Sequence, residues 1–183
     1  MLRAIHPVVN TGLNIFWRAR PSRRHINSPL QDENLVLSED RACLRGIIQR
    51  FPYWQRGRLL LAEASLRADD IATAYAEAQA LRVLAPQGGP LHAASLGLLG
   101  RCYLRRGDAS SALHLLNEAS QMRPHDYPIL EERAAAYALL GERSQALELL
   151  KTIPQHQLSA EGRAAMQWLG EKGNDSKAPH GRS

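Results

Sequence analysis

The sequence is poor in the residues on which catalytic, metal-binding and disulfide-stabilised proteins depend. Its 183 residues include two cysteines and seven histidines. Cys43 and Cys102 form no CxxC pair, and no histidine lies at metal-ligand spacing from either, so we expect no metal site. We expect both cysteines to be small buried residues in a reducing compartment. Because HExxH, GxSxG and phosphate-loop motifs are absent, we expect no enzyme, no cofactor and no small-molecule substrate.

Aromatic residues and long apolar runs are also scarce. Aromatic side chains make up 5% of the chain, and β-branched residues rarely cluster. Leucine, alanine, glutamate, glutamine and arginine dominate instead, which favours an all-α fold. The most apolar stretch near the start, residues 4–17, is interrupted by His6, Pro7, Asn10 and Asn14. It is too short and too polar to span a bilayer, so we expect no integral membrane segment.

Acidic residues are missing from the first 31 positions, which carry Arg3, Arg18, Arg20, Arg23 and Arg24. The rest of the chain balances 18 basic against 18 acidic residues (23 − 5 = 18 basic; all 18 acids follow position 31). We interpret residues 1–31 as a disordered basic arm, with a mitochondrial targeting segment as the alternative. The expected location is the cytoplasm, or the mitochondrion under that alternative. The neutral remainder gives no charge argument for nucleic-acid binding.

The positive signal in the sequence is an internal repeat. A central stretch contains Gly100, Tyr103, Gly107, Ala112, Leu116, Ala119 and Pro124. A copy 34 residues later places Ala134, Tyr137, Gly141, Ala146 and Leu150 at the corresponding positions. A copy 38 residues earlier places Ala62, Ala74, Ala78 and Pro86 there, and the turn at 87–90 accommodates the extra length.

Each copy predicts a helix, a turn and a second helix. In the central copy, Gly107 is a left-handed stop and Asp108 caps the helix expected at about 109–122. Pro124 ends that second helix. We expect Gly100 to face Ala112 and Ala119, because small residues there let the two helices approach closely.

The flanks of the repeats predict capping helices. Residues 32–52 contain a helix with Ser38 as its N-cap and with Leu44, Ile47, Ile48 and Phe51 on one face; it is a cap or a degenerate repeat. Residues 53–157 hold the three repeats. Residues 158–170 hold a helix capped by Ser159, with Ala165, Trp168 and Leu169 inward. Residues 171–183 are interpreted as a disordered tail.

This pattern resembles the tetratricopeptide repeat family, over residues 53–153. The matching structural positions are Ala62, Ala74, Pro86, Gly100, Tyr103, Gly107, Ala112, Ala119, Pro124, Tyr137, Gly141 and Ala146. Ser65, Arg133 and Leu158 depart from the pattern. The resemblance implies a right-handed superhelical solenoid of about three helix–turn–helix repeats with flanking capping helices.

The resemblance also implies a concave groove that binds a protein or peptide. Its lining positions are Arg56, Leu59, Glu63, Leu66 and Arg67, then Ala94, Gly97, Arg101, Leu104 and Arg105, then Pro128, Glu131, Ala135, Ala138 and Leu139. One subgroup of the family clamps chaperone C-terminal tails with lysine, asparagine and arginine at positions that hold Leu59, Glu63, Leu98, Pro128 and Glu132 here. Docking of a chaperone tail is therefore not expected.

The leading interpretation is a protein–protein adaptor, scaffold or accessory subunit. Arg67, Arg101 and Arg105, beside Leu66 and Leu104, suggest a partner segment with acidic and apolar residues. The opposing interpretation is that these arginines only solvate the helix faces or pair with internal acids. A different class of function is nucleic-acid association through the basic arm. Self-association into a homo-oligomer stays open.

Overall fold

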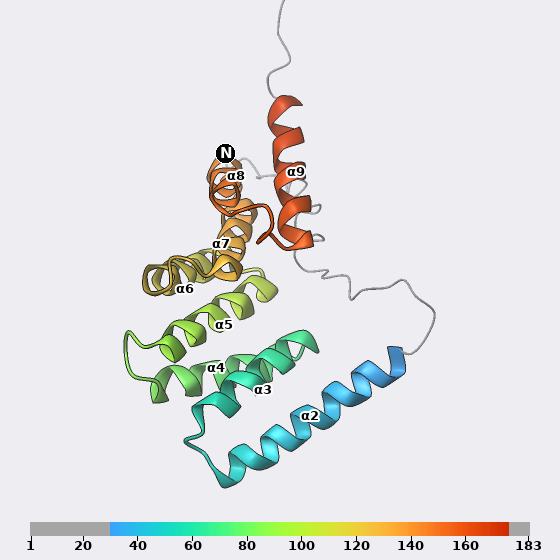
Figure 1. The fold of residues 1–183 in the computed structure, drawn as a ribbon, viewed down its shortest axis with the longest axis vertical. Coiled ribbons are helices and arrows are strands. Elements are labelled where there is room, and N and C mark those ends of the chain that lie inside the picture. Colours follow the sequence, from blue (N-terminus) through green and yellow to red (C-terminus); the bar gives the residue numbers. More distant parts are fainter. Residues whose placement is uncertain (1–29, 176–183) are drawn as a thin grey trace, which may run out of the picture.

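The computed structural model describes residues 30–175, and every regular element in that range is an α-helix. The elements are α2 (Leu30–Arg50), α3 (Gln55–Arg67), α4 (Ile71–Leu84), α5 (Pro90–Arg106), α6 (Ala109–Met122), α7 (Tyr127–Leu139), α8 (Arg143–Thr152) and α9 (Ala160–Asp175). Figure 1 shows them stacked in chain order, with α2 at one end and α9 at the other. The predicted all-α repeat fold is confirmed. None of these helices is both long and apolar enough to span a bilayer.

Three helix pairs form the body of the stack. They are α3 with α4, α5 with α6 and α7 with α8, and the second helix of each pair packs on the first helix of the next. The first helices also contact one another directly, α3 with α5 and α5 with α7. This arrangement puts α3, α5 and α7 on one face of the molecule. At the ends, α2 packs on α3 and α9 packs on α8 (Figure 1).

An aspartate side chain begins one helix in each pair by accepting a hydrogen bond from a backbone N–H three residues on. Asp70 accepts from Thr73 at 3.1 Å, Asp108 from Ser111 at 3.0 Å and Asp126 from Ile129 at 3.4 Å. The hydrogen bonds from Thr73 and from Ser111 lower the pKa values of Asp70 and Asp108. The predicted cap at Asp108 and the predicted helix at 109–122 are confirmed.

A left-handed residue ends the first helix of each pair. Gly107 has φ 85° and Gly141 has φ 86°, a conformation that costs glycine little. The corresponding residue of the first pair is Asp69, with φ 59°. Aspartate tolerates this region better than most residues. The left-handed stop predicted at Gly107 is confirmed, whereas the role of Asp69 was not anticipated.

The core consists of two clusters along the stack. One runs from α3 to α7 and the other from α7 to α9. The small residues predicted at the repeat positions are inaccessible to solvent: Ala62, Ala74, Ala112, Ala119, Ala134 and Ala146 all have 0% exposure. Tyr103 packs edge-on against Tyr75, with ring centroids 5.9 Å apart. The repeated small residues therefore set the distance between packed helices, as the sequence predicted.

The partner of Gly100 differs from the prediction. A Cβ atom on Gly100 would lie 2.6 Å from Cγ of Leu116 and 2.8 Å from its Cδ2, so Leu116 fills the space above the glycine. The three atoms nearest to that Cβ all belong to Leu116, and none belongs to the expected neighbours Ala112 and Ala119. The reason is geometric, because a branched leucine reaches across the interface where an alanine cannot.

Two predictions about α2 are wrong. The helix begins at Leu30, so Ser38 lies inside it and is not its N-cap. Ile47 and Phe51 are 36% and 62% exposed, although they were expected to share a buried face with Ile48, which is 6% exposed. The physical reason is that α2 packs mainly on α3, and one neighbouring helix covers only a narrow stripe.

At the other end, α9 begins after Ser159, whose hydroxyl accepts a hydrogen bond from the Gly162 N–H at 2.9 Å. This is the cap that the sequence predicted. Ala165 and Leu169 are each 4% exposed, and Arg143 lies over the ring of the half-buried Trp168. The helix continues to Asp175, past the expected end at 170. The basic arm up to residue 29 and the tail from 176 lie outside the described residues.

The two cysteines have different environments. Cys102 is fully buried, and this burial raises the pKa of its thiol to about 11. Cys43 is exposed on α2, which contradicts the expectation that both are buried. Both thiols are free, and only one of them is accessible to solvent. This arrangement is not that of a disulfide or of a site shared by the two cysteines.

Candidate functional site

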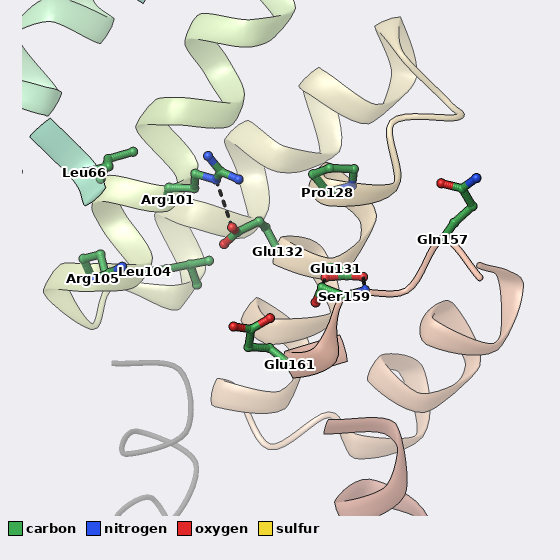
Figure 2. Close-up of a pocket in the computed structure, with 10 residues that line it drawn as sticks. All are labelled: Leu66, Arg101, Leu104, Arg105, Pro128, Glu131, Glu132, Gln157, Ser159 and Glu161. Atoms are coloured by element: carbon green, nitrogen blue, oxygen red, sulfur yellow. Dashed lines mark hydrogen bonds and ion pairs between the residues drawn. The ribbon is translucent and has the colours of Figure 1, made fainter. Parts of the chain in front are cut away.

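The face made by α3, α5 and α7 contains two adjoining hollows, which together we call the groove. The first, of about 260 Å³, lies between the ends of α3 and α5, the start of α7 and the first turn of α9. The second, of about 220 Å³, lies between α3, α5 and α7. They share Arg101, Pro128 and Glu132. Figure 2 shows side chains from all four helices around the first hollow.

The groove contains most of the residues that the sequence assigned to it. Leu66, Arg101, Leu104, Arg105, Pro128 and Glu131 line the first hollow, and Leu59, Glu63, Ala94 and Gly97 line the second. Arg56 and Arg67 are exposed but line neither. Ala135 and Ala138, expected on the groove surface, are 0% and 5% exposed. Ala138 is buried because it packs in the cluster that α8 and α9 share with α7.

Arg101 and Arg105 in the groove both form ion pairs within the chain. Nε of Arg101 on α5 donates to Oε1 of Glu132 on α7 at 2.9 Å (Figure 2). Nη1 of Arg105 donates to Oδ1 of Asp69 at 2.7 Å. The Arg101 and Arg105 side chains are 31% and 17% exposed. Internal ion pairs are therefore present for these two arginines. The first pair joins α5 to α7, and the second joins α5 to the turn after α3.

The pair between Arg105 and Asp69 depends on a departure from the repeat pattern. Asp69 occupies the left-handed position that glycine holds in the next two repeats, at 107 and 141. A carboxylate at this position reaches α5, which a glycine could not. The signal was present in the sequence, because the 38-residue offset aligns Asp69 with Gly107. It was missed because helix C-termini are usually assigned by searching for glycine.

Glu131 holds the start of α9 against α7. Its Oε1 accepts a hydrogen bond from the Ser159 N–H at 2.7 Å, and its Oε2 accepts one from the Ser159 hydroxyl at 2.6 Å. Glu131 is only 9% exposed. Gly162 makes the approach possible, since a Cβ there would lie 2.8 Å from Glu131 Oε1. The residue predicted as a groove contact is thus mainly a docking point for α9, and a carboxylate suits a helix N-terminus.

Sequence reasoning missed the contribution to the groove of α9 and of the segment just before it. Gln157, Ser159 and Glu161 line the first hollow beside Glu131 and Glu132 (Figure 2). The lining of this hollow therefore carries carboxylates as well as the two arginines. Its residues are brought together by the packing of α9, which no local motif encodes. Across the described residues, no three His, Cys, Asp or Glu side chains gather in a way that could hold a metal ion.

Comparisons with known proteins agree with this geometry. A family model described as tetratricopeptide repeat matches residues 103–169. The crystal structure of the P58(IPK) TPR domain superimposes with a TM-score of 0.62 at 19% sequence identity. The match covers 82% of this chain and 44% of that one, so this chain spans less than half of that structure. At this identity the likeness concerns the fold. No curated protein matches the sequence.

Proposed function

We propose that this chain binds a segment of a partner protein in the groove and acts as an adaptor, scaffold or accessory subunit without a catalytic role. The tetratricopeptide-repeat match over residues 103–169 and the likeness in fold to a TPR domain support this proposal. The observation that carries the proposal is the pair of adjoining hollows across three successive first helices. Each hollow is smaller than the roughly 300–1,000 Å³ of pockets for drug-sized ligands. Such volumes suit individual side chains of an extended or helical segment.

The residues that line the groove favour a partner segment that combines apolar and acidic residues. Leu59, Leu66 and Pro128 provide apolar contacts in the two hollows. A guanidinium has five N–H donors, and the ion pair of Arg101 with Glu132 uses Nε, so its Nη groups can receive a carboxylate of the partner. The nearby Glu132 and Glu161 reduce the net positive potential. We therefore propose that apolar contacts dominate affinity and that Arg101 sets orientation.

Affinity capture from a nuclease-treated native lysate tests this proposal. We expect a discrete protein partner on the wild-type chain and its loss on Arg101→Glu/Arg105→Glu. The matched control is Arg82→Glu/Lys151→Glu, which makes the same change in charge on the second helices α4 and α8 and should retain the partner. Melting curves check that the groove variant is folded.

A further variant separates loss of binding from loss of an internal ion pair. Arg101→Glu/Glu132→Arg reverses the polarity of the pair while keeping opposite charges on α5 and α7. We expect a melting temperature close to wild type and no partner. Retention of the partner on every groove variant would refute groove binding. Capture of nuclease-sensitive nucleic acid alone would favour the basic arm instead.

A further inference from the structure

The turn between α2 and α3 exposes a cluster of aromatic side chains that line neither hollow of the groove. Phe51 is 62% exposed, Tyr53 79% and Trp54 37%, and Ile47 beside them is 36% exposed. Together with Arg50 and Pro52 these residues surround a shallow hollow. Figure 1 shows the turn at an outer corner of the molecule. We call Phe51, Pro52, Tyr53 and Trp54 the aromatic turn. Exposed apolar clusters of this kind mark interaction sites.

The aromatic turn is held in place by its own contacts. Nε and Nη2 of Arg58 donate to the Pro52 carbonyl at 3.0 and 2.8 Å, and the Trp54 N–H donates to the Phe51 carbonyl at 3.0 Å. The Trp54 ring lies against Gly57, where any Cβ would overlap it. Because the backbone of the turn and the Trp54 ring are held, binding does not have to order them.

The chain segment that contains the turn carries charges of one sign. Residues 41–62 contain five arginines and no aspartate or glutamate. Three of them form ion pairs with two acids, since Arg41 and Arg45 share Asp70 and Arg58 pairs with Glu77. Arg50 and Arg56, on either side of the aromatic turn, are exposed, and no ion pair involves them among the described residues. The surface is therefore apolar and aromatic with a cationic rim.

We propose that the aromatic turn is a docking site for a bilayer rich in anionic phospholipid. Tyrosine and tryptophan favour the membrane interface, where a ring meets hydrocarbon and its polar tip meets water, and arginines pair with lipid phosphates. A second copy of the chain fits less well, because a symmetric contact at the turn would bring its Arg50 and Arg56 together with their own copies. The five arginines of the basic arm at 1–31 make that arm a poorer occupant for the same reason.

Vesicle co-sedimentation of the full chain tests this proposal, which does not rest on the groove. We expect binding to phosphatidylcholine vesicles that contain phosphatidylglycerol, and much weaker binding to phosphatidylcholine alone. Phe51→Ser/Tyr53→Ser should lower the partition coefficient at least about tenfold. Arg50→Gln/Arg56→Gln should lower it about 25-fold, from about fivefold for each cation at an anionic surface.

Matched controls distinguish binding through the aromatic turn from binding through the overall positive charge. All variants retain the basic arm, so its contribution to vesicle binding is the same in each. Val83→Ser removes an exposed apolar side chain elsewhere, and Arg67→Gln/Arg82→Gln removes two charges elsewhere. Both controls should leave more of the binding intact than the turn variants do. Equal binding of turn and control variants, or no binding by wild type, would overturn the proposal. A turn variant that alters the oligomeric state or loses a protein partner, without any vesicle binding by wild type, would overturn it in favour of a protein contact.

Discussion

Replacing Gly100 with leucine is expected to lower the free energy of unfolding by about 1–3 kcal/mol, because a larger side chain overpacks a filled interface. An added Cβ alone would lie 2.6 Å from Cγ of Leu116, which is fully buried. Gly100→Ala is therefore also expected to destabilise the fold, although alanine favours helix over glycine by about 1 kcal/mol. Chemical denaturation measures both changes.

The control for Gly100 is another helical glycine without a neighbour. Nothing lies within 4 Å of a Cβ built on Gly46 of α2, so Gly46→Ala should stabilise the protein by roughly 0.5–1 kcal/mol. Leu116→Ala provides the complementary test, since it removes the side chain that meets Gly100. The combined cost of Gly100→Ala and Leu116→Ala should be smaller than the two single costs added together. Strict additivity, or a stabilising Gly100→Ala, would show that the interface has been assigned wrongly.

Replacing Glu131 with alanine should release the start of α9 from α7. The substitution removes the acceptor for the Ser159 N–H and hydroxyl, and hydrogen bonds to a charged group contribute about 1.5–3 kcal/mol each. We expect a loss on the order of 3 kcal/mol in the stability of this end of the stack. Hydrogen exchange should show faster exchange of the α9 amides, with little change in α3 to α5.

The matched control for Glu131 is Glu148→Ala on α8. Glu148 is exposed and has no described partner, so its loss should leave exchange in α9 unchanged. For Glu131→Gln, the exchange rate of the α9 amides should lie between those of Glu131→Ala and Glu148→Ala. The reason is that the single amide oxygen can still accept a hydrogen bond from the Ser159 N–H. Unaltered exchange in α9 of Glu131→Ala would contradict the docking role. If Glu131→Ala then also lost the partner, Glu131 would act mainly as a partner contact in the groove, as the sequence predicted.

The repeat positions were predictable from the sequence because they follow local rules. The spacing identified the small residues of the core. Gly107 indicated the end of one helix, and Asp108 indicated the start of the next. The same rules could not tell which residue lies opposite Gly100, since helix spacing gives a face and not the reach of a side chain. They also could not predict that Ile47 and Phe51 are exposed, because exposure depends on how many helices α2 contacts.

The groove was predictable in its location and less so in its chemistry. Periodicity and the family resemblance placed Leu66, Arg101 and Leu104 together on the first helices, and the structure brings them to one hollow. The pairing of Arg101 with Glu132 joins residues 31 positions apart, and that of Arg105 with Asp69 joins residues 36 apart. Such contacts follow from the superposition of repeats in space. A single sequence contains the residues but not the pairing.

Site-specific photocrosslinking tests the groove most directly. A photoreactive amino acid would be placed at Glu63 or Glu161, both half-buried in the groove, and separately at Val83 on α4, which is 84% exposed. Groove binding predicts one protein partner crosslinked from Glu63 and Glu161 and none from Val83. A partner crosslinked only from Val83, or equally from all three positions, would contradict it.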